Sequence, residues 1–497
     1  MALPAKRTQL PLIALLCCLV GTLILLLAPN LVLDWVGPAI SRILSLLGRP
    51  FFLLLQCLLA GLLLLLLTPL ARRRLGGTDA RVEFSTPAWL SMLFAAGMGS
   101  GLVFWGVAEP VYHAANPPLI APAADAAGQA LSLTYLNWGL HAWALYAICG
   151  LLVSRLLSHG SEPQMADRVL DALGIQSAET SRRVARAVNL VALLAVFFGV
   201  TGTIANSGLL LRQGLEQELA LDSPAWTGVL ILFAIFVVYM SSAMTGLKRG
   251  IKRLSQFNML LAALMLLIIL WRADASALGS LILISTWQYL QLALGNMLAL
   301  PDAFTEPKWL DYWTYNYHFW WLAWGPFVGM FLARISLGRP VWQYVLAVVL
   351  VPTLFSIVWF SAFGGLALLA EQNTPTDLLA VVSEDYTQGL MTYLGQLGQR
   401  GKWLIWLSLL LLLIFVATSA DSAILVINQL TGSAGATQTL LWGLLLALAA
   451  SGLFFYGQES LNRLVAIIGA LPFLVIFVLQ LLGALRAWLG LPGEHRL

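Results

Sequence analysis

Charged residues are scarce in this chain. They make up 10% of its 497 residues, whereas a soluble domain carries roughly 25%, and 60% of the residues are hydrophobic. This balance excludes a water-soluble domain of useful size. Apolar runs of about 20 residues, the length that crosses roughly 30 Å of hydrocarbon as a helix, recur along the whole chain. The composition therefore predicts an all-α membrane protein.

Cysteine and histidine are also few, at four and five residues. The cysteines all fall inside apolar runs, where thiols behave as small hydrophobes and not as a disulfide framework. An integral-membrane enzyme would need clustered His, Asp or Glu within the spans, and His113, His141 and His318 have no such partners in the sequence. The basic residues form short clusters rather than one basic face, which argues against a nucleic-acid partner. A channel is disfavoured because no repeated filter is visible.

Twelve membrane spans are predicted, with both termini on the same side. The basic clusters at 72–74, 182–186, 248–253 and 334–339 all fall on that side, which the positive-inside rule makes cytoplasmic. We therefore expect a multi-pass protein of the inner (plasma) membrane. The predicted spans are 11–31, 50–70, 88–113, 128–155, 187–216, 224–244, 255–272, 314–335, 341–363, 403–430, 437–456 and 463–487.

The longer connections carry some structure of their own. Residues 273–312 place Trp and Tyr amid polar residues, which predicts an amphipathic segment in the outer membrane interface. Residues 364–400 predict a second outer loop, and residues 156–186 hold one short polar helix at most. Residues 488–497 are expected to form a short cytoplasmic tail.

Two spans look interrupted, at matching places in the two halves of the chain. Three glycines lie within residues 97–101 of the third span, and each costs about 1 kcal/mol in a helix interior. Gly325 and Pro326 interrupt the eighth span. Paired breaks five spans apart are typical of an inverted-repeat transporter, in which unwound backbone binds the solute or the ion. The alternative is a packing glycine in one span and a proline kink in the other.

Aromatic residues gather deep in the fourth and eighth spans. A cation that has no removable proton can bind to the faces of Trp and Tyr rings, each contributing roughly 0.5–2 kcal/mol when desolvated. The carboxylate of such a solute would find backbone N–H groups at the glycine break, formed by Met98, Gly99, Ser100 and Gly101. Membrane anchoring or helix packing is the alternative for any one ring. The rings are Trp138, Trp143, Tyr146, Trp320, Trp321, Trp324 and Phe327.

The charged residues within the predicted spans include Arg334, Asp421 and Glu109. An isolated charge at the bilayer centre costs about 3 kcal/mol or more, so we expect Arg334 and Asp421 to pair as an inner-gate or scaffold contact. A proton relay through these residues is the alternative. Glu109, just before Pro110, is expected to cap the outer end of the third span rather than to bind substrate.

The same residues closely resemble the betaine/choline/carnitine transporter family. Four motifs carry the resemblance in the family's order, at 97–110, 138–146, 320–336 and 417–422, and the resemblance spans residues from about 85 to 480. It implies twelve spans, the last ten of which form a LeuT-type five-plus-five inverted repeat. On this basis residues 1–75 hold two extra N-terminal helices, residues 85–272 the first repeat and residues 313–487 the second, with 273–312 connecting them. It also implies a homotrimer.

The resemblance assigns roles by motif position. Trp138, Trp143, Tyr146 and Trp321 match the aromatic box of the family, while Trp320, Trp324 and Phe327 match residues that line the same cavity or its cytoplasmic exit. In sodium-coupled members one ion binds between the glycine break and the tenth span. Hard oxygen ligands at those positions suit Na⁺, although Thr-Ser pairs in membranes commonly bond back to their own helix. The matching positions are Ala95, Met98, Phe415, Thr418 and Ser419.

This sequence also departs from the family pattern. Val196 and Val200 stand where a second sodium site would need two hydroxyls, so we expect that site to be absent. Ser100 stands where betaine-selective members often have isoleucine. The leading interpretation is import of a glycine betaine-like quaternary-ammonium osmolyte by sodium symport, with Na⁺ as the coupling ion and no cofactor. Proton-coupled choline uptake and sodium-independent carnitine-type exchange remain alternatives, the latter because Lys252 enters the seventh span.

Overall fold

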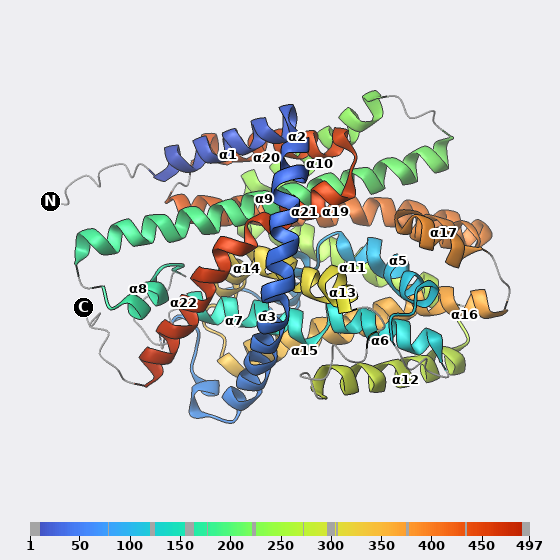
Figure 1. Cartoon of the computed structure of the whole chain (residues 1–497), viewed down its shortest axis with the longest axis horizontal. Coiled ribbons are helices and arrows are strands. Elements are labelled where there is room, and N and C mark those ends of the chain that lie inside the picture. The colour runs from blue at the N-terminus through green and yellow to red at the C-terminus, as the bar shows by residue number, and fades with distance from the viewer. Residues whose placement is uncertain are drawn as a thin grey trace.

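The computed structural model describes residues 10–77, 79–119, 125–154, 164–175, 177–220, 225–271, 273–295, 304, 307–373, 377–432 and 435–489. Most of the predicted tail, 490–497, lies outside these residues. The described chain is helical, apart from turns and two isolated β-bridges, Arg74 with Pro340 and Leu119 with Phe304. Most long helices run side by side along the long axis of the molecule, and α3 crosses them at a steep angle (Figure 1).

The helices of the first half follow the predicted spans, with α3 starting well before the predicted 50–70. Their bounds are α1 (Leu10–Leu27), α2 (Pro29–Leu31), α3 (Gly37–Leu66), α4 (Thr86–Met98), α5 (Gly101–Ala115), α6 (Ala126–Trp138), α7 (Leu140–Val153), α8 (Asp167–Leu173), α9 (Ala178–Leu219), α10 (Ala225–Thr245) and α11 (Lys252–Leu270). The short α8 is the polar helix expected within residues 156–186.

The second half adds short helices where a loop was predicted at 364–400. The bounds are α12 (Ala275–Leu294), α13 (Pro307–Leu310), α14 (Asn316–Ile335), α15 (Val341–Phe360), α16 (Leu366–Asn373), α17 (Leu378–Glu384), α18 (Gly389–Gly395), α19 (Gly398–Thr431), α20 (Ala436–Tyr456), α21 (Glu459–Ile468) and α22 (Ala470–Trp488). Wider π-helical turns at Leu247–Ile251, Asp311–Tyr315 and Ser361–Gly365 join or end some of these helices.

Among the described residues, 11 helical segments are long and apolar enough to cross a membrane, and the bent pair α4 and α5 brings the number to 12. The number of spans agrees with the prediction, but the helices that make it up are not all the predicted ones. Helix α12 is included, and its exposed face is apolar, with Leu283 and Trp287 at 73% and 63% exposure, so this segment is less amphipathic than predicted. Helix α14, the predicted eighth span, is not among these segments. It lies inside the helical bundle, where nearly all of its residues are buried.

The predicted breaks have different outcomes. The third span is broken as expected: α4 and α5 meet at an angle of 57°, with Gly99 at a φ of +56°. The break predicted at Gly325 and Pro326 is wrong, because α14 continues through both residues. Gly325 is instead a packing glycine, since a Cβ there would lie 3.0 Å from Cys149 Sγ on α7.

An unpredicted break divides the fourth span at Gly139, between α6 and α7. Tyr289 of α12 reaches into this break, where its hydroxyl accepts a hydrogen bond of 2.8 Å from the backbone N–H of Leu140. A Cβ on Gly139 would lie 2.4 Å from the same hydroxyl oxygen. Glycine is therefore required here for close approach. The break directs Trp138, the last residue of α6, toward the site described next.

Candidate functional site

The broken third span lets aromatic rings approach the backbone closely. A Cβ on Gly97 would lie 2.7 Å from the Trp143 ring, and a Cβ on Gly101 would lie 2.9 Å from the Trp138 ring. Contacts under 3.0 Å would force one group to move. The glycines therefore do more than break the helix, because their missing side chains make room for the rings of the fourth span.

Trp321 of α14 lies at the centre of the ring cluster. Its ring centroid is 5.3 Å from that of Trp138, 5.9 Å from Trp143 and 5.2 Å from Tyr146, and all three contacts are tilted or edge-to-face. Its indole N–H donates a hydrogen bond of 3.1 Å to the backbone carbonyl of Asn137, which fixes the ring. The structure thus brings together the four rings that the sequence assigned to the aromatic box.

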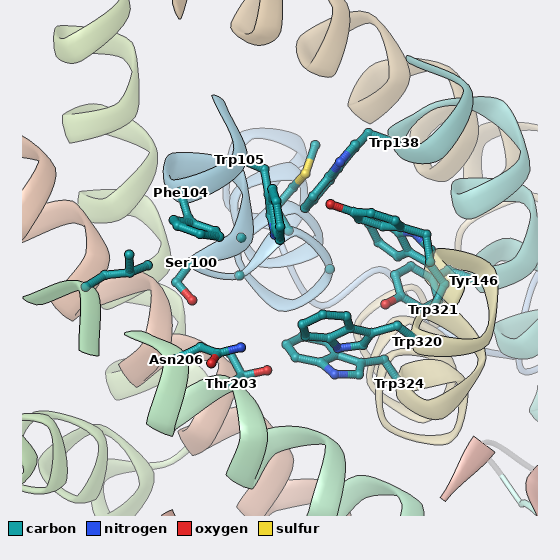
Figure 2. A pocket seen from close by; sticks show the side chains of 16 residues that line it. Ser100, Phe104, Trp105, Trp138, Tyr146, Thr203, Asn206, Trp320, Trp321 and Trp324 are labelled. Atoms are coloured by element: carbon teal, nitrogen blue, oxygen red, sulfur yellow. The ribbon is translucent and has the colours of Figure 1, made fainter. Parts of the chain in front are cut away.

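A cavity opens beside this cluster (Figure 2). Two of the predicted binding residues do not line it. Trp143 is fully buried behind Trp321, and Phe327 is fully buried behind Trp324, 5.6 Å away between centroids. Both were assigned by motif position, which does not distinguish rings at the cavity surface from rings packed behind them. The predicted residues that do line the cavity are Met98, Gly99, Ser100, Gly101, Trp138, Tyr146, Trp320, Trp321 and Trp324.

Six further lining residues were missed by the sequence analysis. The polar ones, Thr203 and Asn206, lie one turn apart in the apolar helix α9, and this spacing was the available signal. Figure 2 shows them at the edge of the cavity opposite Trp138. The six residues are Phe104, Trp105, Thr203, Asn206, Leu210 and Tyr317.

Hydroxyl and amide groups form a polar side of the cavity. Ser207 donates a hydrogen bond of 2.7 Å to the backbone carbonyl of Thr203, so Ser100, which contacts the Ser207 oxygen, is the donor in that pair. Thr203 donates its own proton to Gly199 at 3.2 Å. Ser100 and Thr203 therefore offer lone pairs to the cavity rather than protons.

The residues proposed for sodium lie where the tenth span meets the glycine break. Thr418 and Ser419 donate hydrogen bonds of 2.9 Å and 3.1 Å to the carbonyl of Phe415, so both hydroxyls bond back to their own helix, α19. A Cβ on Gly99 would lie 3.5 Å from Ser419 Oγ. Because α4 ends at Met98, the carbonyls of its last turn have no partner further along that helix. The Ser419 hydroxyl of α19 thus lies beside the end of α4.

The predicted pair of Arg334 and Asp421 is wrong. Arg334 donates a hydrogen bond of 2.7 Å to Glu83, in the loop before α4, while fully buried Asp421 accepts hydrogen bonds from Ser242 and Ser422. Hydropathy placed both charges within spans but could not show which neighbours each one faces. The hydrogen-bond partners of this carboxyl group are therefore hydroxyl groups and not a cation.

Glu83 joins three parts of the chain at the end where the basic clusters lie. Its carboxylate bonds Arg334 at the end of α14 and lies 3.0 Å from Lys248 before α11. Partial burial alone would raise the pKa of Glu83, but the hydrogen bonds and charges of Arg334 and Lys248 outweigh it and hold the pKa below its usual range. The contact therefore persists at neutral pH.

The described residues contain no cluster of three or more His, Cys, Asp or Glu that could hold a metal ion. What they do contain is a broken helix, a wall of aromatic rings and a polar face around one cavity, all between membrane helices. Such an arrangement defines a membrane transporter with its solute site between helices.

Comparison with known proteins agrees. The model of the BCCT family, the betaine/carnitine/choline family transporters, matches residues 9–490, so the chain belongs to this family. It is 36% identical over 432 residues to an uncharacterised transporter of Mycobacterium tuberculosis, covering 84% of this chain and 71% of that one. It is 30% identical over 439 residues to the glycine betaine transporter OpuD of Bacillus subtilis, covering 87% and 85%. It is 32% identical to a glycine betaine/proline/choline/ectoine transporter of Vibrio parahaemolyticus, covering 84% and 75%. The protein is thus a transporter and not an enzyme.

Proposed function

We propose that this protein imports a quaternary-ammonium osmolyte of the glycine betaine type by sodium symport, through alternating access. The observation that carries the substrate is the cluster of Trp138, Tyr146 and Trp321, whose rings meet at one side of the cavity. Aromatic faces attract a cation by their quadrupole and do not require it to donate a hydrogen bond, which suits a trimethylammonium group. Relatives named as glycine betaine transporters point to the same solute class.

Backbone at the helix break would hold the other end of the solute. Met98, Gly99, Ser100 and Gly101 all line the cavity. At the start of α5, the N–H groups of Val103 and Phe104 donate to the Ser100 carbonyl, whereas those of Gly101 and Leu102 have no partner within that helix and lie at the positive end of its dipole. A carboxylate is favoured at such a place. The cavity thus offers a cation surface and an anion surface.

Sodium coupling is supported by the hydroxyl oxygens of α19, of which Ser419 Oγ lies beside Gly99 at the end of α4. The hydroxyl protons of Thr418 and Ser419 both point to the Phe415 carbonyl, so the lone pairs of both oxygens are free for a cation. Carbonyls at the end of α4, among them those of Ala95 and Met98, would complete a shell of hard oxygen ligands. Val196 and Val200 are buried and carry no ligand oxygen, which favours one Na⁺ per solute rather than two.

We further propose that the two halves of the chain form an inverted repeat of the LeuT type, with residues 1–75 outside it. The broken α4–α5 pair opens the first repeat and α14 opens the second, and both contribute to the cavity. By the positive-inside rule, the end of the molecule with Glu83, Lys248 and Arg334 faces the cytoplasm. The Glu83 contact would then close the inner side while the cavity is open to the outside.

Uptake by proteoliposomes tests the proposal. With the Na⁺ gradient and the membrane potential set independently, the reversal potential of glycine betaine flux gives the stoichiometry, and we expect one Na⁺ per solute. Thr418→Ala should raise the Na⁺ concentration for half-maximal uptake severalfold, while the control Val200→Thr should leave it unchanged because Val196 still lacks a ligand. A reversal potential that follows the proton gradient and does not depend on Na⁺ would contradict sodium symport and indicate proton symport instead.

A further inference from the structure

A buried carboxylate stands directly behind the aromatic wall. Glu109 lies on α5, is fully buried, and does not line the cavity. The expectation that it caps the outer end of the third span is wrong. Its oxygens accept hydrogen bonds from three side chains on two other helices: Asn137 at 2.8 Å, the indole N–H of Trp138 at 2.8 Å and the hydroxyl of Tyr317 at 2.7 Å.

The donors around Glu109 are those of an ionised carboxylate. The amide nitrogen of Asn137 and the indole nitrogen of Trp138 can only donate, and each takes a different carboxylate oxygen. Among the described residues no Lys or Arg pairs with Glu109; the nearest basic group is His113, 3.5 Å away on the same helix. Hydrogen bonds to a charged acceptor are roughly twice as strong as neutral ones, which offsets the desolvation of the carboxylate. The three hydrogen bonds of Glu109 thus all come from neutral groups.

Two of the three donors are themselves cavity residues. Trp138 and Tyr317 line the cavity, and their ring centroids are 5.7 Å apart. Figure 2 shows the Trp138 ring edge-on beside the cavity, near Trp321. A carboxylate bonded to the indole N–H polarises that ring and makes its face more negative. The charge also acts directly through a wall of low dielectric, in which it is weakly screened.

We propose that Glu109 supplies the negative potential with which the aromatic wall holds a cation, and that it thereby sets the preference between solutes of net positive charge and zwitterions. The proposal rests on the proposed function, because it requires that the cavity bind a quaternary ammonium group. A solute without a carboxylate, such as choline, feels the full attraction of Glu109. In a zwitterion such as glycine betaine, the negative charge of the solute's own carboxylate is repelled by Glu109, which reduces the net attraction.

Replacing Glu109→Gln in the purified full chain tests this. Glutamine keeps the size and one acceptor oxygen but removes the charge. Two unit charges separated by roughly 10 Å at an effective dielectric constant of about 20 interact by an energy that corresponds to roughly a tenfold change in affinity. We therefore expect choline binding, measured by isothermal titration calorimetry, to weaken about tenfold and glycine betaine binding only about two- to threefold. Glu109→Asp keeps the charge and should restore the wild-type ratio of the two affinities.

A second pair of variants distinguishes an effect of the Glu109 charge on binding from a structural effect, even if Glu109→Gln does not fold. Trp138→Phe keeps a ring but cuts its link to Glu109, whereas Trp321→Phe changes a neighbouring ring whose N–H bonds a backbone carbonyl instead. The ratio of choline to glycine betaine affinity should fall about threefold in Trp138→Phe and stay within twofold in Trp321→Phe.

Equal losses for both solutes in Glu109→Gln, or equal ratios in the two Phe variants, would reduce Glu109 to a structural contact between helices. Failure of the wild-type chain to bind either solute would instead count against the proposed function. The two failures are therefore distinguishable.

Discussion

Trp321 and Trp143 were assigned to the same aromatic box, but the structure gives them different positions, and this difference can be measured. Trp321 lines the cavity, while Trp143 is fully buried behind it, against Gly97 and 5.9 Å from Trp321 between ring centroids. Only a ring at the cavity surface can lie face to face with a bound cation. We therefore expect Trp321→Phe to weaken solute binding and Trp143→Phe to weaken mainly the fold.

The magnitudes follow from the contacts. Trp321→Phe replaces the best cation-binding ring with a weaker one, at about 0.5–1 kcal/mol, and loses the anchoring hydrogen bond to the carbonyl of Asn137. With about 1.4 kcal/mol per tenfold change, glycine betaine affinity should fall about three- to tenfold. Trp143→Phe leaves the cavity surface intact but removes buried ring atoms. We expect its affinity to stay within about twofold and its unfolding free energy to fall by about 1–2 kcal/mol.

Calorimetric titration of the purified proteins gives the affinities, and thermal unfolding without solute gives the stabilities. The two variants are matched, since each makes the same chemical change within one ring cluster. A larger loss of affinity in Trp143→Phe than in Trp321→Phe would refute the assignment of the two rings to different layers. Equal stability losses would leave the binding argument standing, because both rings are well packed.

Three further changes test other parts of the site. Gly97→Ala would place a Cβ 2.7 Å from the Trp143 ring, so we expect about 1–3 kcal/mol of destabilisation in thermal unfolding; no loss would show that the ring yields freely. Ser100→Ile removes a lone-pair oxygen from the polar side of the cavity and should shift competition for uptake about fivefold from choline toward glycine betaine; an unchanged ratio would remove Ser100 from selectivity. Glu83 has a lowered pKa, so its contacts stabilise the fold above its unfolded pKa of about 4.3 and are lost as pH falls through the folded value. Glu83→Gln should therefore cost at most about 1 kcal/mol at pH 7, and thermal unfolding from pH 3.5 to 7 should show a flatter profile than wild type; identical profiles would contradict this.

Much of the site could be predicted because short motifs carry it. The glycine break, Trp138, Tyr146 and Trp321 are local features, and each kept its place in the structure. Glu109 was misjudged because its donors come from residues 28, 29 and 208 positions away in the sequence. Gly325 failed in the opposite way: a break and a packing glycine look alike in sequence, and only the position of Cys149 shows which one is present.

A many-span membrane protein with aromatic rings clustered in two of its spans could be predicted from the sequence, since apolar run length, glycine clusters and motif order are properties of neighbouring residues. The tertiary structure alone decided which ring faces the cavity, which partner each buried charge takes and which helix supplies the polar side. Those choices depend on how helices rotate and pack against one another. Rotating a helix by one residue turns a side chain by about 100°, which moves it from a cavity surface to the packing behind it.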